Sequence, residues 1–573
     1  MLIICVPRPS PIVPRKPEGK LMANITIDGK QYTVKDGITI IEAIDQVAKT
    51  DLPRYCYHPG LSIAGNCRIC QVEVEKMPRT VIACNTRVTE GMVIHTKSQK
   101  AKESQQIVLE FLLANHPLDC PVCDQAGECK LQDYYMDYGL YDPKFDDQKV
   151  KKTKKAVSVG PTIMLDQERC ILCTRCVRFG DEITKTSDFG VFNRGDHSEL
   201  DIYPGKELNN KYSGNVADIC PVGALTDKDF RFKMRVWYLG SAESVCTGCS
   251  RGCNILINYE KSRPYPSKNG RVMRLKPREN QEVNKWWMCD EGRYGYKFID
   301  ENRIVDVKIS DAAGAHGRAT QQRISDWKTA LEKTAQALKQ AKPEQWAVLA
   351  SPQYTNEELF LIQKLFAGHL KWKNAAFYAP NQEGYEDDFL MKKDKNPNTS
   401  GAIQILKGFE RDITPLVEKA KKGEFKGLFI FGHDIAKIYG ADTLKTLREK
   451  VPFIIYEGWT ANATADAADV VLPSATYAEK EGTFTNFEGR VQRIRKAVNE
   501  LGDSRATWEI MRDLINAVGA GLVPAHSGRP QGSSLQYLRP EFIFEDLAKE
   551  NAAFHGLDYK IIGKKGTTQR NKN

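Results

Sequence analysis

The sequence predicts a multidomain protein of mixed α+β and α/β class. The chain has 573 residues, which is too long for one ordinary hydrophobic core. Its 16 cysteines all lie within the first 289 residues, where they form tight local sets. Beyond them, short apolar runs alternate with helical patterns, as in domains with a parallel sheet. We therefore expect several small cysteine-bearing domains followed by one larger α/β domain.

Composition and charge exclude several function classes. With 41% hydrophobic and 27% charged residues, the chain is globular rather than disordered. The net charge of +10 could serve nucleic acid or an acidic protein partner, but no nucleic-acid motif supports the first option. No stretch approaches the ~20 apolar residues of a membrane span. The apolar run Leu2–Val6 is too short for a signal peptide, so residues 1–22 are expected to be an unstructured leader or a misassigned start.

The cysteine spacing favours metal over disulfides. Disulfide frameworks belong to small secreted domains, whereas this chain is large and shows no secretion signal. A zinc site usually takes two pairs of ligands. Here three thiols fall on one loop as C-x2-C-x2-C, and a fourth comes from a distant Cys-Pro, which is the ligand arrangement of bacterial ferredoxins. The spacing therefore indicates iron–sulfur clusters.

Residues 23–100 are predicted to form a β-grasp domain of the [2Fe–2S] ferredoxin type. An Asp-Gly turn divides Ile25–Val34 into two alternating strands, and Ile38–Ala48 has the apolar spacing of a helix. The first cysteine gap is x10 rather than the x4 of plant-type ferredoxins, so the loop is a variant. A merely buried, apolar Cys84 is the alternative interpretation. The expected ligands are Cys56, Cys67, Cys70 and Cys84.

Residues 101–148 carry a set that has only three cysteines, although a cubane needs four ligands. His116 lies four residues before the first of them, at the end of the helix-like stretch Ser104–Asn115. A lone histidine is usually a satisfied polar residue, but imidazole replaces thiolate on iron in Rieske centres. The expected [4Fe–4S] ligands are His116, Cys120, Cys123 and Cys129.

Residues 149–242 contain the most specific signal and are predicted to form a ferredoxin-like [4Fe–4S] domain. The triplet C-x2-C-x2-C is completed by the passage Cys220-Pro-Val-Gly-Ala. No second triplet lies near Cys220, so one cluster is expected. The charged run Lys149–Lys155 is interpreted as a solvated inter-domain linker. The expected ligands are Cys170, Cys173, Cys176 and Cys220.

Residues 243–300 carry C-x2-C-x3-C and a fourth cysteine after x35, the spacing of the [4Fe–4S] module that opens molybdopterin oxidoreductases. Zinc is the alternative metal for this set. The expected ligands are Cys246, Cys249, Cys253 and Cys289. Fifteen cysteines and His116 thus fill four sets, which predicts one [2Fe–2S] cluster and three [4Fe–4S] clusters and leaves only Cys5 over.

Residues 301–573 are predicted to form the α/β domain, and they show no nucleotide-binding fingerprint. The expected buried strands are Gly427–Phe431 and Val451–Tyr456. The expected helices are Trp327–Lys339, Asn356–Phe366 and Asp442–Lys450.

Three passages of the chain resemble the family of the large iron–sulfur subunit of bacterial NADH–quinone oxidoreductase. They start at Cys56-Tyr-His-Pro-Gly, at His116-Pro-Leu-Asp-Cys and at Ala467-Ala-Asp-Val-Val-Leu-Pro. The likeness covers nearly all of residues 23–500. The last passage looks like the degenerate molybdopterin-oxidoreductase domain of that family, so no molybdenum is expected.

By this resemblance, the chain works in respiratory complex I. A partner subunit would take hydride from NADH onto flavin, and this chain would relay single electrons toward quinone without an NADH, flavin or quinone site or a catalytic residue of its own. The Cys56, Cys170 and His116 clusters would lie on the path, with the Cys246 cluster beside it. The implied partners are the flavin subunit and the quinone-side subunits of the peripheral arm. The implied location is the bacterial cytoplasm, peripheral on the inner membrane.

Three rival functions share these modules. A molybdenum formate dehydrogenase normally binds its metal through a Cys or selenocysteine beyond the last cluster, and only a serine could serve after Cys289. An iron-only hydrogenase needs further cysteines in its C-terminal half. A subunit of an NAD-reducing hydrogenase or a soluble diaphorase could use the same modules, and co-purifying subunits would distinguish it.

Overall fold

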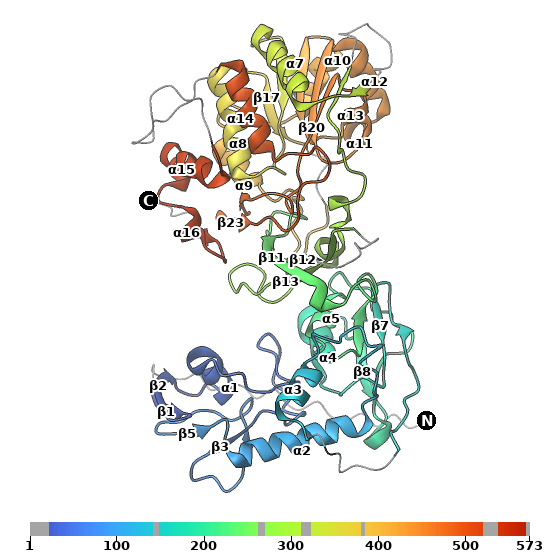
Figure 1. The fold of residues 1–573 in the computed structure, drawn as a ribbon, viewed down its shortest axis with the longest axis vertical. Coiled ribbons are helices and arrows are strands. Elements are labelled where there is room, and N and C mark those ends of the chain that lie inside the picture. The colour runs from blue at the N-terminus through green and yellow to red at the C-terminus, as the bar shows by residue number, and fades with distance from the viewer. Residues whose placement is uncertain are drawn as a thin grey trace. The chain divides into compact units, whose positions relative to one another are not determined.

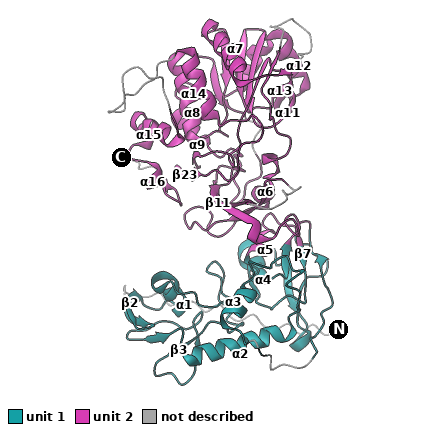
Figure 2. Cartoon of the chain, viewed as in Figure 1, with its two compact units in different colours: residues 1–160, 164–208, 219–226 teal, residues 161–163, 209–218, 227–573 magenta. Residues whose placement is uncertain are grey.

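The computed structural model describes residues 22–140, 142, 148–261, 270–310, 322–379, 384–519 and 537–568. The chain forms two compact units (Figure 2). The first comprises residues 1–160, 164–208 and 219–226, and the second comprises residues 161–163, 209–218 and 227–573. The first unit therefore contains three of the four predicted ligand sets, and the second contains the set that ends at Cys289. Of the predicted leader, only Met22 lies among the described residues.

The first unit begins with a five-stranded sheet in the order β2-β1-β5-β3-β4. Asp28 and Gly29 adopt φ angles of +48° and +81°, the left-handed values that a type I′ hairpin turn requires. Thr39 and Glu42 form a capping box that starts α1, and the π-helical turn η1 continues it. The predicted hairpin and helix are confirmed. The bounds are β1 (Met22–Ile27), β2 (Lys30–Lys35), α1 (Ile40–Ala43), η1 (Ile44–Ala48), β3 (Gln71–Val74), β4 (Val81–Ile82) and β5 (Val93–His95).

Short helices and small antiparallel strand pairs build the rest of the first unit (Figure 1). Strand β6 pairs with β7, and β8 pairs with β9. The helix α2 begins at Gln99, five residues before the predicted start, because Ser98 caps it. The bounds are α2 (Gln99–Asn115), α3 (Lys130–Tyr138), β6 (Val157–Ser158), β7 (Ile163–Leu165), α4 (Arg175–Phe179), η2 (Gly180–Thr184), β8 (Phe189–Phe192), η3 (Gly195–His197), β9 (Glu199–Ile202) and β10 (Leu225–Asp227). The helix α5 (Asn215–Ile219) belongs to the second unit except for its last residue.

The run Lys149–Lys155 is mostly exposed to solvent, as predicted, but its lysines also contact neighbouring elements. Lys149 Nζ donates to the carbonyl oxygens of Leu113 and Ala114, at 2.8 and 2.9 Å, and so completes the C-terminal end of α2. Lys155 Nζ lies 2.8 Å from a carboxylate oxygen of Asp119. The lysines of this run therefore bind neighbouring elements of the first unit.

An eight-stranded sheet forms the core of the second unit, in the order β15-β14-β21-β20-β19-β16-β17-β18. The six strands from β21 to β18 pair in parallel. At one edge, β14 pairs antiparallel with β21, and β15 pairs antiparallel with β14. The strand β19 matches its predicted bounds, whereas β20 begins and ends two residues later than the predicted strand. The strands are β14 (Lys308–Ser310), β15 (Gln322–Ile324), β16 (Trp346–Leu349), β17 (Ala375–Tyr378), β18 (Glu410–Asp412), β19 (Gly427–Phe431), β20 (Phe453–Gly458) and β21 (Val470–Pro473).

Helices cover both faces of this sheet, so that alternate residues of one strand enter different cores. Phe429 and Phe431 pack on one face, whereas Leu428 and Ile430 pack on the other. All three predicted helices are present, with ends shifted by one to three residues. The bounds are α7 (Trp327–Gln340), α8 (Asn356–Gln363), η6 (Lys364–His369), α9 (Thr399–Ile405), α10 (Thr414–Lys421), α11 (Ile435–Tyr439), α12 (Ala441–Lys450), α13 (Ala463–Asp466), α14 (Thr507–Val518), α15 (Pro540–Glu550), η8 (Ala552–Phe554) and α16 (Tyr559–Ile562).

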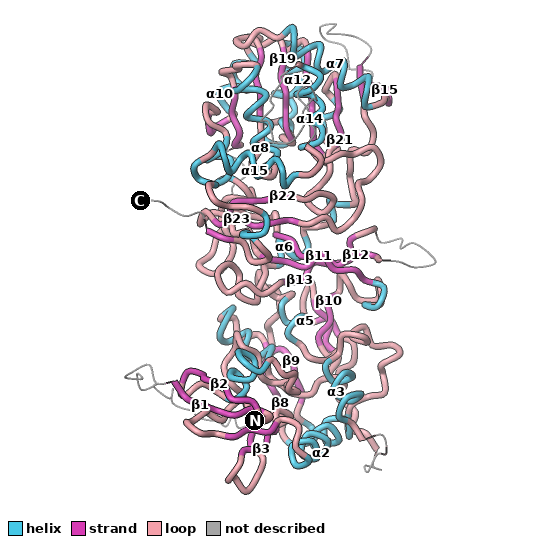
Figure 3. Tube along the Cα trace, turned by 60° about the vertical axis from the view of Figure 1, so that its left-hand side comes forward, coloured by secondary structure: helices cyan, strands magenta, loops and turns pink. Residues whose placement is uncertain are grey.

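Two three-stranded antiparallel sheets complete the second unit (Figure 3). Their inner faces share one core, to which Val245, Ile255, Phe484 and Ile494 contribute. The elements are η4 (Val236–Tyr238), β11 (Leu239–Val245), β12 (Asn254–Glu260), β13 (Val272–Pro277), α6 (Asp290–Tyr294), η5 (Lys297–Ile299), β22 (Gly482–Thr485), β23 (Arg490–Ile494) and β24 (Thr567–Thr568). No described helix has both the length and the apolar composition that crossing a bilayer requires.

Charged side chains are buried in the second unit, and each has polar partners. Lys480 Nζ lies 2.7 and 2.8 Å from the two carboxylate oxygens of Glu358. Tyr354 and Thr507 donate hydroxyl hydrogen bonds to Glu457, at 2.5 and 2.7 Å. Burial nevertheless raises the pKa of Glu457 to about 7, because the charged carboxylate loses its hydration.

Candidate metal centres

The Cys56 set consists of Cys56, Cys67, Cys70 and Cys84, and the structure brings all four thiols together. The Sγ atoms of Cys56 and Cys67 are 3.3 Å apart, and the Cys56 amide donates to Cys67 Sγ at 3.4 Å. Cys84 contacts both Cys56 and Cys70 through its thiol. Hydrogen bonds from Cys67 and Cys84 lower the pKa of Cys56, whereas the same contacts and burial raise the pKa values of Cys67 and Cys84. The thiolate, the form that binds metal, is therefore favoured at Cys56.

Three loops position this set. Cys56 follows η1, Cys67 and Cys70 precede β3, and Cys84 follows β4. The amide of Ala83 donates to the Cys70 carbonyl at 2.8 Å, which holds the last loop against the second one. Gly65 has a φ of +63°, a conformation that favours glycine, at the entry to the second loop.

The His116 set consists of His116, Cys120, Cys123 and Cys129, on the connection between α2 and α3. His116 is the C-cap of α2, and Cys129 is the N-cap of α3. His116, Cys120 and Cys129 line one cavity of about 1490 Å³. Cys123 lies close enough that its charge, like that of Cys120, adds to the effect of burial in raising the pKa of Cys129 to about 11.

His116 has the properties of a ligand rather than of a satisfied polar residue. Its Nδ1 atom is buried and has no hydrogen-bond partner among the described residues. Burial and the positive charge of Lys149 lower the pKa of His116 to about 4, so the ring is neutral at pH 7. A neutral imidazole with a free ring nitrogen is the form that binds metal.

The Cys170 set consists of Cys170, Cys173, Cys176 and Cys220. All four line a cavity of about 370 Å³, together with apolar side chains such as Val222 and Leu225. Leu172 and Thr174 adopt left-handed φ angles of +53° and +58°, which wind the triplet loop tightly before α4. Burial raises the pKa of each of the four thiols, because the cavity offers thiolates no water. Bound iron would supply the missing positive charge.

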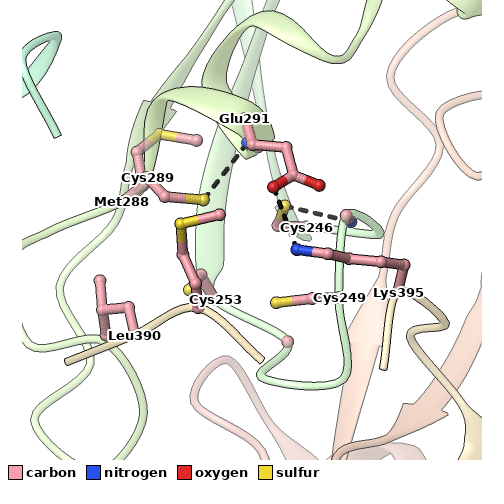
Figure 4. Close-up of a pocket in the computed structure, with 12 residues that line it drawn as sticks. Cys246, Cys249, Cys253, Met288, Cys289, Glu291, Leu390 and Lys395 are labelled. Atoms are coloured by element: carbon pink, nitrogen blue, oxygen red, sulfur yellow. Dashed lines mark hydrogen bonds and ion pairs between the residues drawn. The ribbon is translucent and has the colours of Figure 1, made fainter. Parts of the chain in front are cut away.

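The Cys246 set consists of Cys246, Cys249, Cys253 and Cys289, and the close-up shows these thiols around one cavity (Figure 4). The cavity has about 370 Å³, the same volume as that of the Cys170 set. The Gly248 amide donates to Cys246 Sγ at 3.4 Å, and the Gly292 amide donates to Cys289 Sγ at 3.3 Å. A Cβ atom at Gly292 would lie 2.9 Å from Cys246 Sγ, so the close approach requires glycine there.

Charged residues beside the thiols escaped the sequence analysis. Lys395 lines the Cys246 cavity, and its Nζ lies 3.0 Å from Glu291 (Figure 4). Arg175 and Arg178 lie beside the other triplet, on α4. The only sequence signal for these charged residues is that Arg175 and Arg178 lie close to cysteines in the chain. Among the described residues, no three His, Cys, Asp or Glu side chains have the spacing of a single-ion site. The Cys170 set and the Cys246 set each line a cavity, which suits a group of several atoms.

Thiols from the first three sets contact one hydrophobic core in the first unit. This shared core contains Cys56, Cys129 and Cys173, one from each set, and they are only 1%, 9% and 9% exposed. Its other buried members are Tyr55, Ile69, Leu109, Leu131, Tyr134, Val222 and Ala224. The three sites are therefore joined by one packed apolar core.

Five family models match consecutive parts of the chain, which confirms the predicted order of modules. They are the 2Fe-2S iron-sulfur cluster binding domain (residues 21–99), the NADH-ubiquinone oxidoreductase-G iron-sulfur binding region (105–144), the NADH-quinone oxidoreductase subunit 3 ferredoxin-like domain (160–226), the molybdopterin oxidoreductase Fe4S4 domain (241–301) and molybdopterin oxidoreductase (398–517). The chain is thus built from domains of [2Fe–2S] and [4Fe–4S] proteins.

Curated relatives match along almost the whole chain. The G subunit of the NADH-quinone oxidoreductase of Rickettsia conorii is 30% identical over 95% of this chain and 92% of its own length. An NADH dehydrogenase [ubiquinone] iron-sulfur protein 1, mitochondrial, of Solanum tuberosum is 31% identical over 88% of this chain and 81% of its own. The chain belongs to the family of NADH-quinone oxidoreductase G subunits, which confirms the resemblance seen in the sequence.

A solved structure of an NAD+-reducing [NiFe]-hydrogenase in the H2-reduced state is 29% identical to part of this chain. The match covers 37% of this chain and 91% of the hydrogenase chain, with a TM-score of 0.34. A TM-score this low supports no statement about fold or function.

Proposed function

We propose that this chain is the iron–sulfur electron-transfer subunit of the peripheral arm of NADH:quinone oxidoreductase. It passes single electrons from the flavin-bearing, NADH-oxidising subunit toward quinone. The observation that carries the proposal is the shared core, which contacts the Cys56, His116 and Cys170 sets at once. When bound, the clusters supply one-electron carriers whose potentials depend on ligands, hydrogen bonds and exposure.

The side chains of the core do two things for such a relay. Leu109, Leu131 and Val222 pack apolar surface against the thiols, which lowers the local dielectric around them. Tyr55 and Tyr134 pack edge to face with ring centroids 5.4 Å apart and fill the space between the sets. Rigid packing of this kind holds the sites at fixed separations.

We assign one [2Fe–2S] cluster to the Cys56 set and one [4Fe–4S] cluster to each of the other three. For the Cys246 set, the match of residues 241–301 to the molybdopterin oxidoreductase Fe4S4 domain favours a cubane over zinc.

We also propose the partners and the location of the chain from its family membership. The curated relatives are named as subunits of a multisubunit oxidoreductase, which supports docking with the flavin subunit and with quinone-side subunits. We infer a peripheral position on the cytoplasmic face of a bacterial inner membrane.

Metal analysis and EPR of the anaerobically purified, dithionite-reduced chain test the assignment. We expect about 14 iron atoms per chain, no molybdenum, and signals of one binuclear and three tetranuclear clusters. Cys176→Ser should remove the signal of one tetranuclear cluster, whereas Cys5→Ser, which changes the one cysteine outside the four sets, should remove none. About ten iron atoms with one zinc would show that the Cys246 set is a zinc site. An iron-free chain would refute the function.

The relay itself is tested in the assembled complex. NADH should reduce the clusters of this chain when the flavin subunit is present, and it should leave the isolated chain oxidised. Reduction of the isolated chain by NADH would contradict the absence of a flavin and NADH site.

A further inference from the structure

Two arginines on α4 bridge the loops of two different ligand sets. Arg178 Nη2 donates to the carbonyl oxygen of Cys56 at 2.6 Å and to that of Cys173 at 3.1 Å. Its Nη1 atom donates to the carbonyl oxygen of Ser62, further along the first loop. One guanidinium thus touches the backbone of a ligand from the Cys56 set and of a ligand from the Cys170 set.

Arg175 makes a second bridge of the same kind. Its Nη2 atom donates to the Tyr57 carbonyl at 2.6 Å, and its Nη1 atom donates to the Ile219 carbonyl at 3.0 Å. Tyr57 follows Cys56 directly, and Ile219 precedes Cys220 directly. The Nε atom of Arg175 is buried without a hydrogen-bond partner among the described residues.

Neither guanidinium has a carboxylate to balance its charge in the part of the chain that the structure describes. Arg175 and Arg178 are half-buried. A guanidinium stays protonated in proteins, and a partly desolvated cation without a counter-charge is costly. The groups around Arg175 that can carry a negative charge are the thiols of Cys173, Cys220 and Cys56. Cysteine-ligated clusters are anionic, so they would provide the charge balance that no acidic side chain gives.

We propose that Arg175 and Arg178 are counter-charges shared by the Cys56 and Cys170 clusters, and that they raise the reduction potentials of both. This inference rests on the proposed function, because it requires both clusters. Reduction adds one electron, and so one negative charge, to either site while the arginines stay protonated. A fixed positive charge nearby stabilises the reduced form more than the oxidised form.

A purely structural role predicts something different. The same two loops are also joined by a neutral contact, because the Asn66 side-chain amide donates to the Leu172 carbonyl at 3.0 Å. Loss of that contact would loosen the loops without changing the charge near the clusters. Asn66→Ala is therefore the control for structure. Arg194→Gln, which removes an exposed arginine of the same unit, is the control for net charge.

The test measures the midpoint potentials of both clusters by EPR-monitored titration of the full-length chain. Arg175→Gln and Arg178→Gln should each lower the equilibrium constant for one-electron reduction about tenfold at both clusters, a fall of ~59 mV. Arg178→Lys, which keeps the charge, should recover most of the potential. Asn66→Ala and Arg194→Gln should leave both potentials at their original values.

Unchanged potentials in both glutamine variants, with clusters retained, would overturn the proposal, and so would a shift at only one cluster. If the glutamine variants lose iron, the Lys variants at both positions decide the matter. Recovery of iron by lysine supports the counter-charge, whereas continued loss assigns a hydrogen-bonding role only. If the unaltered chain holds both clusters and the variants show no shift in potential, only this inference is refuted. If the unaltered chain holds no clusters, the proposed function is refuted.

Discussion

Gly223 offers a sharp test of the His116 site, because an added methyl group would strike one of its ligands. A Cβ atom at this position would lie 2.2 Å from Cys123 Sγ and 3.2 Å from Gln125 Cβ. Ordinary van der Waals contact begins near 3.4 Å, so the Cys123 thiol must move by more than about 1 Å. Gly223→Ala should therefore displace one ligand of four, and overpacking in a tight core costs roughly 1–3 kcal/mol.

The assay is EPR with iron counting, on Gly223→Ala beside Gly180→Ala. A Cβ atom at Gly180 would meet its nearest neighbour at 3.6 Å, so this control adds the same methyl group in the same unit without a clash. We expect Gly223→Ala to lose or alter the signal of the His116 cluster and to lose up to about four iron atoms. If its spectrum and iron content match those of Gly180→Ala, Cys123 is not a ligand in the place that the structure gives it.

Three further predictions concern single residues. His116→Cys should keep its cluster but lower the potential, since thiolate adds a negative charge, and an unchanged EPR spectrum would show that His116 is not a ligand. Cys289→Ser should reduce the iron count by about four, whereas loss of zinc would identify a zinc site. Burial raises the folded-state pKa of Glu457 from 4.5 to about 7, so its contribution to stability is present below about pH 4.5 and is lost as the pH rises to 7. In unfolding experiments between pH 5 and pH 8, Glu457→Gln should remove up to about 3 kcal/mol of this loss of stability. The exposed residue Glu424 supplies the control Glu424→Gln. An equal pH dependence of stability in the two variants would contradict the raised pKa of Glu457.

Local signals made most of the fold predictable. The Asp28-Gly29 turn needs two left-handed residues, and the strand β19 is a run of five buried positions, so both are encoded within a few residues. The predicted start of α2 at Ser104 is wrong, because Ser98 caps the helix and α2 begins at Gln99. The contacts of the run Lys149–Lys155 were not predictable, because partners such as Asp119 lie 36 residues away from Lys155 in the sequence.

The ligand sets were predictable because cluster chemistry fixes the type and spacing of residues along the chain. The structure places each predicted set in one region. What spacing could not show is the environment. Neither the bridging arginines nor the position of Gly223 against Cys123 follows from sequence, since each depends on contacts between segments some 100 residues apart.

The shared core has a consequence for how the protein matures in the cell. Because thiols of three sets form part of one apolar interior, metal bound at any one site should stabilise the folded unit for the others. Iron limitation should therefore yield fully loaded chains beside empty ones, with few intermediates. The empty chains would expose apolar surface and become substrates for proteases, so that cellular iron supply sets the abundance of the subunit.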